Sequence, residues 1–217
     1  MPDDILKETE PRHGNSKVTR NDWLRAARDT LVTKGVGDVK ILTLSGELGV
    51  ARSSFYWYFS DRADLLAALL ADWEARNTRC IVEKCGQVAG SIGEAACNFF
   101  ECFIDDALFD QRLDFAVREW SRRDNKVREM IDAADQQRLE AVTLMFARHG
   151  FTPADADARA RILYFMQLGY HALDVREGME TRMSRIEAYL KGFTGETATP
   201  DVIDAFKQKA FRVGKPE

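Results

Sequence analysis

The chain has 217 residues, of which 45% are hydrophobic and 30% charged, and its net charge at pH 7 is −4. This length suits one large or two small domains with a substantial core, and the composition is typical of a globular protein. No stretch approaches the roughly 20 apolar residues of a membrane span, and the acidic, polar beginning differs from a secretory signal peptide. We therefore expect a cytoplasmic protein.

The charge is distributed unevenly along the chain. Residues 1–11 carry one Lys against four Asp or Glu, residues 12–62 carry nine Lys or Arg against five, and the remaining 155 residues carry 21 against 26. Only the segment 12–62 is therefore basic. A basic segment in an acidic chain is the electrostatic pattern of a local nucleic-acid contact, although a surplus of this size also arises by chance.

The first predicted elements are an arm and a helix. Residues 1–17 combine many charges with two Pro and a Gly, without periodicity, and this predicts a mobile N-terminal arm. From Thr19, a residue type suited to an N-cap, apolar residues follow at helical spacing. The helix is expected to end at Lys34 and Gly35, because a basic last turn followed by glycine is a C-terminal signal.

Residues 44–59 predict two further short helices, 42–48 and 52–58, joined by a sharp turn at Gly49. The apolar positions that would bury them are Leu44, Leu48, Val50, Phe55 and Phe59. The residues expected to face outward are hydrogen-bond donors and flat rings, namely Arg52, Ser53, Ser54, Tyr56, Trp57 and Tyr58. With the preceding helix this arrangement matches a helix–turn–helix, although short helical hairpins also occur in ordinary cores.

A longer helix is then expected from Asp61 to about Lys84, and helical patterns continue to the end of the chain. The later predicted helices are Ser91–Asp106, Arg112–Arg122, Asn125–His149, Ala154–Val175, Thr181–Gly192 and Pro200–Phe211. The fold class is therefore all-α, with about nine or ten helices. We expect a helix–turn–helix domain over 18–62 and a second helical domain over 63–217.

The four cysteines form two pairs, Cys80 with Cys85 and Cys97 with Cys102, each with four residues between its members. A five-residue step turns an α-helix by about 140°, so the members of each pair point to different sides of their helix. This spacing suits neither a zinc site nor a disulfide within a helix. We expect reduced, buried thiols, with a thiol-based redox sensor as the alternative, and we expect no metal and no cofactor.

With these elements in order, the chain resembles the TetR family of bacterial transcriptional regulators. The resemblance lies in residues 44–59 and continues through Asp61–Leu66, with a Gly-Val turn, a small hydroxyl residue, an apolar residue, Tyr, and a final Phe. Tyr58 stands where the family often has His, and Arg62 stands where Lys is common. The C-terminal segments 118–124, 135–138 and 146–151 look like ligand-domain signatures of one subset of the family.

The resemblance and the side-chain chemistry together predict a DNA contact surface. We expect Arg52 and Ser53 to reach base edges and Trp57 to contact a thymine methyl or a sugar, while Tyr56 and Tyr58 bond phosphates. The resemblance places Lys40, Thr43 and Arg62 beside the DNA backbone. The complete predicted set is Lys40, Thr43, Arg52, Ser53, Ser54, Tyr56, Trp57, Tyr58 and Arg62. The alternative interpretation makes Tyr56 and Trp57 partly buried packing rings.

A recognition helix of two turns reads only a few base pairs, so we expect a homodimer that sets two such helices about 34 Å apart on a palindromic operator. The predicted dimer face lies on helix 154–175 and the helices after it. Its residues are Ala158, Ile162, Phe165, Leu168, Gly169 and Ala172. The alternative is that this face packs inside the monomer.

The resemblance also implies a small-molecule pocket among the middle helices. The candidates are Phe99, Phe100, Phe103, Phe115, Trp120, Tyr164, Met166, Tyr170 and His171. Aromatic residues at helical spacing are more often core residues, and Glu101 with Asp105 is expected on a solvated face. The implied function is a repressor that a small apolar or aromatic effector releases from its operator by moving helix 61–84.

An all-helical enzyme is the chief alternative from another class. The three histidines, His13, His149 and His171, lie far apart in the sequence. No Gly-rich phosphate loop follows a strand, and no Ser or Cys has an adjacent activating partner. We therefore expect a regulator without enzymatic activity.

Overall fold

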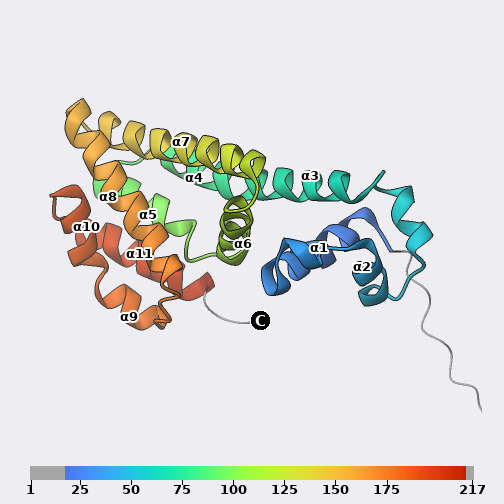
Figure 1. Ribbon diagram of the computed structural model, residues 1–217. Coiled ribbons are helices and arrows are strands. Elements are labelled where there is room, and N and C mark those ends of the chain that lie inside the picture. Colours follow the sequence, from blue (N-terminus) through green and yellow to red (C-terminus); the bar gives the residue numbers. More distant parts are fainter. Residues whose placement is uncertain (1–17, 214–217) are drawn as a thin grey trace, which may run out of the picture.

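The computed structural model describes residues 18–213, and these residues form eleven α-helices and no strand. In Figure 1 the helices α1 (Arg20–Lys34) and α2 (Ile41–Glu47) lie at one end of the molecule, and most of the later helices are stacked at the other end. The all-α prediction is confirmed, with more helices than expected. The expected N-terminal arm lies outside the described residues.

Helix α1 begins and ends where its sequence predicts. The Thr19 hydroxyl accepts a hydrogen bond from the Asp22 amide at 3.3 Å, and the Asp22 carboxylate accepts one from the Thr19 amide at 2.8 Å. This reciprocal arrangement is a capping box, which satisfies backbone donors that the first turn leaves unpaired. At the other end Gly35 has a φ of +86°, a conformation that glycine adopts without the steric cost of a side chain.

The predicted helix 61–84 is a single helical rod with an irregularity in its middle. It comprises α3 (Arg62–Trp73), the π-helical turn η3 (Glu74–Thr78) and α4 (Arg79–Gly86), and Figure 1 shows α3 and α4 almost in line. A π-helical turn inserts one extra residue per turn and is frequent at functional positions. It places Asn77 and Thr78 in the protein interior. The rod continues the chain from the helix–turn–helix end into the larger end of the molecule.

The remaining helices form the larger end of the molecule. They are α5 (Ile92–Glu101), α6 (Gln111–Ser121), α7 (Asn125–Arg148), α8 (Pro153–Ala172), α9 (Met179–Ser184), α10 (Ile186–Thr194) and α11 (Pro200–Val213). Helix α7 packs against both α4 and α8. The single helix predicted over 181–192 is two helices, because the chain turns at Arg185 between α9 and α10.

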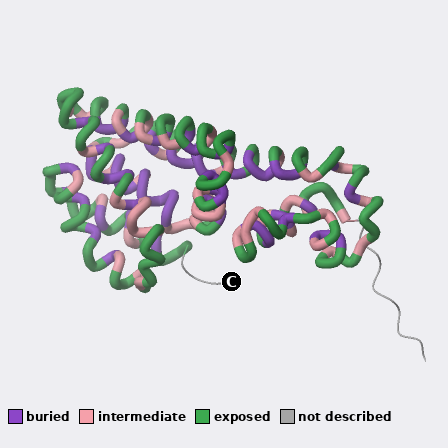
Figure 2. The backbone as a smooth tube through the Cα atoms, viewed as in Figure 1, coloured by how far each residue is buried: buried purple, intermediate pink, exposed green. Residues whose placement is uncertain are grey.

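Two hydrophobic cores support this arrangement, and Figure 2 shows buried residues along the inner sides of the long helices. The first core joins α1, α2 and α3 to α6 and to the N-terminal half of α7, through Leu113, Val117 and Ile131 among others. The second core joins α4, α5 and the helices from the second half of α7 to α11. The expected division after residue 62 therefore falls at the start of α3, whose leucines belong to the first core. Within residues 18–213 no helix is both long and apolar enough to cross a bilayer.

Candidate nucleic-acid interface and ligand pocket

The second helix of the helix–turn–helix is a 3₁₀ helix, η2 (Arg52–Trp57), and it is anchored by aromatic side chains. Phe55 is fully buried and Phe59 almost so. The Phe55 ring packs edge-on against Trp23 of α1, with centroids 5.2 Å apart, and stacks on Phe59 at 5.4 Å. Gly49, with a φ of +66°, makes the turn that brings η2 across α2. The buried rings thus fix which side of η2 faces outward.

Four of the predicted reading residues are exposed on η2. Arg52 and Ser53 are exposed at the start of η2, and Tyr56 and Trp57 are 59% and 72% exposed. The Tyr56 ring touches the edge of Phe55, with centroids 5.4 Å apart, yet most of its surface remains accessible. The structure therefore leaves a guanidinium, two hydroxyls and an indole exposed within the six residues of η2.

Ser54 and Tyr58 were also expected to face outward, but both are half-buried, so that expectation was wrong. The Ser54 hydroxyl donates to the Ala51 carbonyl at 2.8 Å, and the Tyr58 hydroxyl donates to the Val18 carbonyl at 2.8 Å. Tyr58 follows the last residue of η2, and its bond to Val18 holds the end of η2 against the residues before α1. In this structure both hydroxyls hold the local fold, and their contact with DNA stays a prediction.

The three predicted backbone contacts lie around this helix pair. Lys40 is exposed, with its ammonium 3.5 Å from the Asp38 carboxylate, and Thr43 is half-buried on α2. The Arg62 guanidinium donates at 2.6 Å to each of the carbonyls of Val36 and Val39. Arg62 therefore ties the start of α3 to the link between α1 and α2.

A buried ionic cluster, here the Asp114 cluster, links the rod to α6, α7 and α8. It comprises Asp114, Arg118, Asp135, Arg138 and Tyr164. The Asp114 carboxylate, 1% exposed, accepts from Arg118 at 2.9 Å, from Arg138 at 3.1 Å and from the Trp73 indole at 2.8 Å. Burial opposes the ionisation of Asp114, but the two guanidinium groups outweigh it and lower its pKa.

The second carboxylate of the cluster completes the charge balance. Arg118 binds Asp135 through two nitrogens, at 2.8 and 2.6 Å, and the Tyr164 hydroxyl donates to Asp135 at 2.7 Å. Arg138 also donates to the Thr78 hydroxyl of the π-helical turn at 3.1 Å. The cluster was not predicted from the sequence, although the i,i+4 spacing of Asp114 with Arg118 is a visible signal of an ion pair. Tyr164, predicted to line a ligand pocket, is instead buried here.

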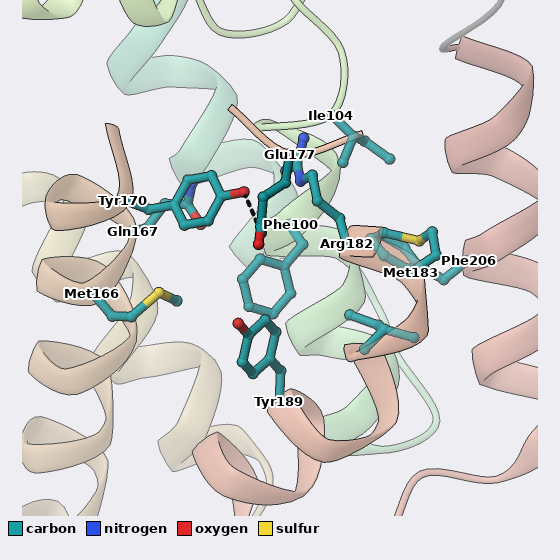
Figure 3. Close-up of a pocket in the computed structure, with 11 residues that line it drawn as sticks. Phe100, Ile104, Met166, Gln167, Tyr170, Glu177, Arg182, Met183, Tyr189 and Phe206 are labelled. Carbon is teal, nitrogen blue, oxygen red and sulfur yellow. Dashed lines mark hydrogen bonds between the residues drawn. The ribbon is translucent and has the colours of Figure 1, made fainter. Parts of the chain in front are cut away.

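A small pocket lies between α5, α8, α9, α10 and α11, and Figure 3 shows its lining residues. Three of the nine predicted pocket residues, Phe100, Met166 and Tyr170, are among them. Figure 3 also shows the Tyr170 hydroxyl bonded to the Glu177 carboxylate, at 3.0 Å. The open space is about 40 Å³, far below the roughly 300 Å³ of a typical small-molecule site. The lining is aromatic and apolar with a few polar groups.

The other predicted pocket residues lie elsewhere. Phe99 and Phe103 are buried in the second core. Phe115 and Trp120 line a separate hollow against the end of α1, because the aromatic side of α6 faces the helix–turn–helix. Treating all these aromatics as one pocket was therefore wrong, since helical spacing does not reveal which neighbour a helix face meets.

His171 does not line the pocket but contacts Gln167, which does. Its ring packs near Phe103, with centroids 5.3 Å apart, and its Nε2 lies 2.8 Å from the Gln167 amide nitrogen. Burial lowers the pKa of His171 to about 4. The ring is therefore neutral at physiological pH and hydrogen-bonded to a pocket residue.

Glu101 corrects a further expectation. It is buried instead of solvated, and its carboxylate lies 2.5 Å from the ammonium groups of both Lys84 and Lys209. The packing of α11 over α5 covers it, and the local sequence contains no signal of that contact. All four cysteines are buried, as predicted. Among residues 18–213 no group of three or more His, Cys, Asp or Glu side chains is arranged to hold a metal ion.

The outer face of α8 carries apolar side chains that the rest of the chain leaves uncovered. Ile162 and Phe165 are 59% and 49% exposed, and Ala158 and Ala172 of the predicted stripe are exposed as well. Leu168 and Gly169 are half-buried. This face therefore lies largely outside the core of the single chain.

Comparison with known proteins relates the helix–turn–helix to a described family. Residues 24–69 match the family model of the bacterial regulatory proteins, tetR family. The chain is 34% identical over 56 residues to the uncharacterized HTH-type transcriptional regulator TtgW of Pseudomonas putida. That match covers 26% of this chain and 42% of TtgW, so the chain spans less than half of this relative.

Solved structures extend the likeness of fold to nearly the whole chain. Mycobacterium smegmatis AmtR has a TM-score of 0.58 at 18% identity, covering 95% of this chain and 100% of AmtR. Salmonella enterica GusR has a TM-score of 0.56 at 13% identity, covering 89% of this chain and 94% of GusR. Residues 24–69 therefore match the tetR family of bacterial regulatory proteins, and the solved structures share the fold over most of the chain.

Proposed function

We propose that this protein is a cytoplasmic, sequence-specific DNA-binding transcriptional regulator that acts as a homodimer. In this proposal it represses from a palindromic operator, and a small apolar or aromatic effector releases it. The observation that carries the proposal is the exposed face of η2, where Arg52, Ser53, Tyr56 and Trp57 stand outward within the region that matches the family.

The chemistry of that face suits a major groove. The Arg52 guanidinium can donate two hydrogen bonds to the O6 and N7 atoms of guanine, and Trp57 can pack on a thymine methyl. The Tyr56 hydroxyl is suited to a phosphate oxygen, a contact that sets register without reading sequence. The surplus of positive charge in residues 12–62 supports a phosphate-facing surface.

The proposed regulation runs through the rod. Its α3 half belongs to the core of the helix–turn–helix, and its α4 half belongs to the second core, which also includes pocket residues. An effector of ordinary size exceeds the present space and must separate the lining helices to enter. If the widened arrangement displaces α4, α3 moves with it and the spacing of the two recognition elements changes. Such a ligand weakens DNA binding to the extent that it prefers the widened arrangement.

The test uses an operator obtained by in vitro selection from random duplexes, with affinity measured by fluorescence anisotropy at a stated salt concentration. Arg52→Ala is expected to weaken binding to the selected site about tenfold to a hundredfold and to leave binding to random duplex almost unchanged. Arg128→Ala is the matched control, because it removes the same charge from an exposed position on α7, away from η2 and from the predicted dimer face.

Tyr56→Phe provides the complementary result. It removes one hydroxyl, so binding is expected to weaken on selected and random duplexes alike. An equal loss for Arg52→Ala on both duplexes would show that Arg52 does not read bases. Failure of the wild-type protein to select any duplex would overturn the proposed function.

A further inference from the structure

Two of the four cysteines, far apart in the sequence, meet in the structure. Cys80 lies on α4 and Cys102 directly follows α5, and their Sγ atoms are 2.7 Å apart. Cys80 is 8% exposed and Cys102 is fully buried. The sequence spacing drew attention to the pairs Cys80 with Cys85 and Cys97 with Cys102, whereas the fold pairs the first cysteine with the last. Two thiols in contact are the arrangement from which a disulfide forms.

The surroundings distinguish Cys80 from the other three thiols. Its hydrogen bond with Cys102 lowers the pKa of Cys80, burial opposes this, and the Lys84 ammonium one turn away adds to the lowering. By contrast, burial raises the pKa of Cys85 and of Cys97 to about 12, and it raises that of Cys102 as well. The thiolate is the reactive form of cysteine. Cys80 also keeps 8% exposure while Cys102 has none, so Cys80 is the more accessible and more reactive thiol of the pair, with Cys102 in contact as a second thiol.

The helices that carry the pair are fastened together beside it. Glu101, the residue before Cys102, forms ion pairs with Lys84 of α4 and Lys209 of α11. Each lysine ammonium lies 2.5 Å from the Glu101 carboxylate. This three-residue ion cluster holds the C-terminal end of α5 against α4. The two sulfur atoms therefore meet between elements that are already in register, and a covalent bond between them requires little rearrangement.

We propose that Cys80 and Cys102 form a reversible disulfide that joins α4 to α5 when the protein meets a peroxide. The Cys80 thiolate attacks one oxygen of hydrogen peroxide, which breaks the O–O bond, releases hydroxide and leaves a sulfenic acid on Cys80. The Cys102 thiol then attacks that sulfur, and water leaves. In total two thiols and one peroxide give one disulfide and two waters, and an added dithiol reverses the change.

This modification bears on the regulation proposed above, because α4 is one half of the rod. Figure 1 shows α4 leading into α3, and α3 contributes Leu65, Leu69 and Leu70 to the core of the helix–turn–helix. A covalent link between α4 and α5 removes part of the freedom of the rod to move. This step rests on the proposed function, whereas the formation of the disulfide does not.

The first experiment tests the chemistry in the full-length protein. The reduced protein is treated with hydrogen peroxide, digested without reductant and analysed by mass spectrometry, and a peptide pair linked through Cys80 and Cys102 is expected. The variants Cys80→Ser and Cys102→Ser should each lose this pair, and Cys97→Ser, a buried thiol on α5, should keep it. Absence of the linked pair in the wild-type protein, or a different pairing, overturns the proposal.

The second experiment tests the consequence for DNA binding. Operator affinity is compared before and after peroxide, and a change of at least about threefold that a dithiol reverses is expected in the wild type. Cys102→Ser should show no such change. If the reduced protein binds no duplex, the proposed function fails while the disulfide stands. If the disulfide forms and affinity does not change, the regulatory part of the inference is overturned.

Discussion

At the scale of single residues, the sequence pattern predicted the exposure of some positions correctly but did not identify contacts between distant residues. Arg52 and Trp57 are exposed as predicted, while Phe55 and Phe59 take the buried positions. The Tyr58 hydroxyl instead bonds the carbonyl of Val18, forty residues earlier in the chain. A contact between residues so far apart depends on the docking of two elements, and no local pattern encodes it.

His171 gives a prediction about pH at this scale. The unfolded chain takes up a proton near pH 6.5, whereas burial lowers the pKa of the folded His171 to about 4. Between these values the unfolded state binds more protons, so the free energy of unfolding decreases as the pH falls. From about pH 7 to about pH 5 the loss due to this group is about 2 kcal/mol.

The measurement is urea unfolding of the wild type and of His171→Asn at both pH values. The variant lacks the titrating ring. Between about pH 7 and about pH 5 its free energy of unfolding should therefore fall by about 2 kcal/mol less than that of the wild type. An identical pH dependence in the two proteins would show that His171 does not titrate differently on folding.

At the scale of elements, the rod shows how much of a long helix the apolar periodicity of the sequence predicts. The spacing of its leucines and the cap at Asp61 predicted one helix to about Lys84, and a helical rod is present from residue 62 to residue 86. The π-helical turn within it was not foreseen. It coincides with Asn77, whose side chain bonds the backbone of Asp110 at 2.9 and 3.0 Å, and these partners come from another segment of the chain.

The Asp114 cluster gives the prediction at this scale, because it attaches the rod to α6 and α7. Asp114→Asn removes a buried charge on which Arg118 and Arg138 converge, and it is expected to lower the free energy of unfolding by about 3 kcal/mol. The change is measured by urea unfolding at neutral pH. The matched control is Asp132→Asn, which breaks an exposed ion pair with Arg128 on α7 and should have a far smaller effect. Equal losses in the two variants would contradict the structural role of the cluster.

At the scale of the whole molecule, the uncovered apolar face of α8 supports a homodimer. Ile162 and Phe165 lie one turn apart on this face and are about half exposed in the single chain. A contiguous apolar face of this kind is typical of an interface between subunits. A dimer would present two copies of η2 to one palindromic site.

The dimer is tested by sedimentation velocity at micromolar concentration. The wild type is expected to sediment as a dimer and Phe165→Arg as a monomer, because a charge in an apolar interface remains unpaired. Val88→Arg, which adds the same charge at a position 98% exposed between α4 and α5, should remain dimeric. A monomeric wild type, or a dimeric Phe165→Arg variant, would contradict this interface.

The sequence by itself determined the all-α class, the ends of α1, and the helix–turn–helix with its match to the tetR family, because these depend on local periodicity, caps and a short motif. Only the tertiary structure decided which helix faces meet. It separated Phe115 and Trp120 from the pocket near Phe100, buried Glu101 between two lysines, and brought Cys80 to Cys102. Such contacts join residues that are distant in the chain. They depend on how the helices pack against one another, and a helical pattern is compatible with more than one packing arrangement.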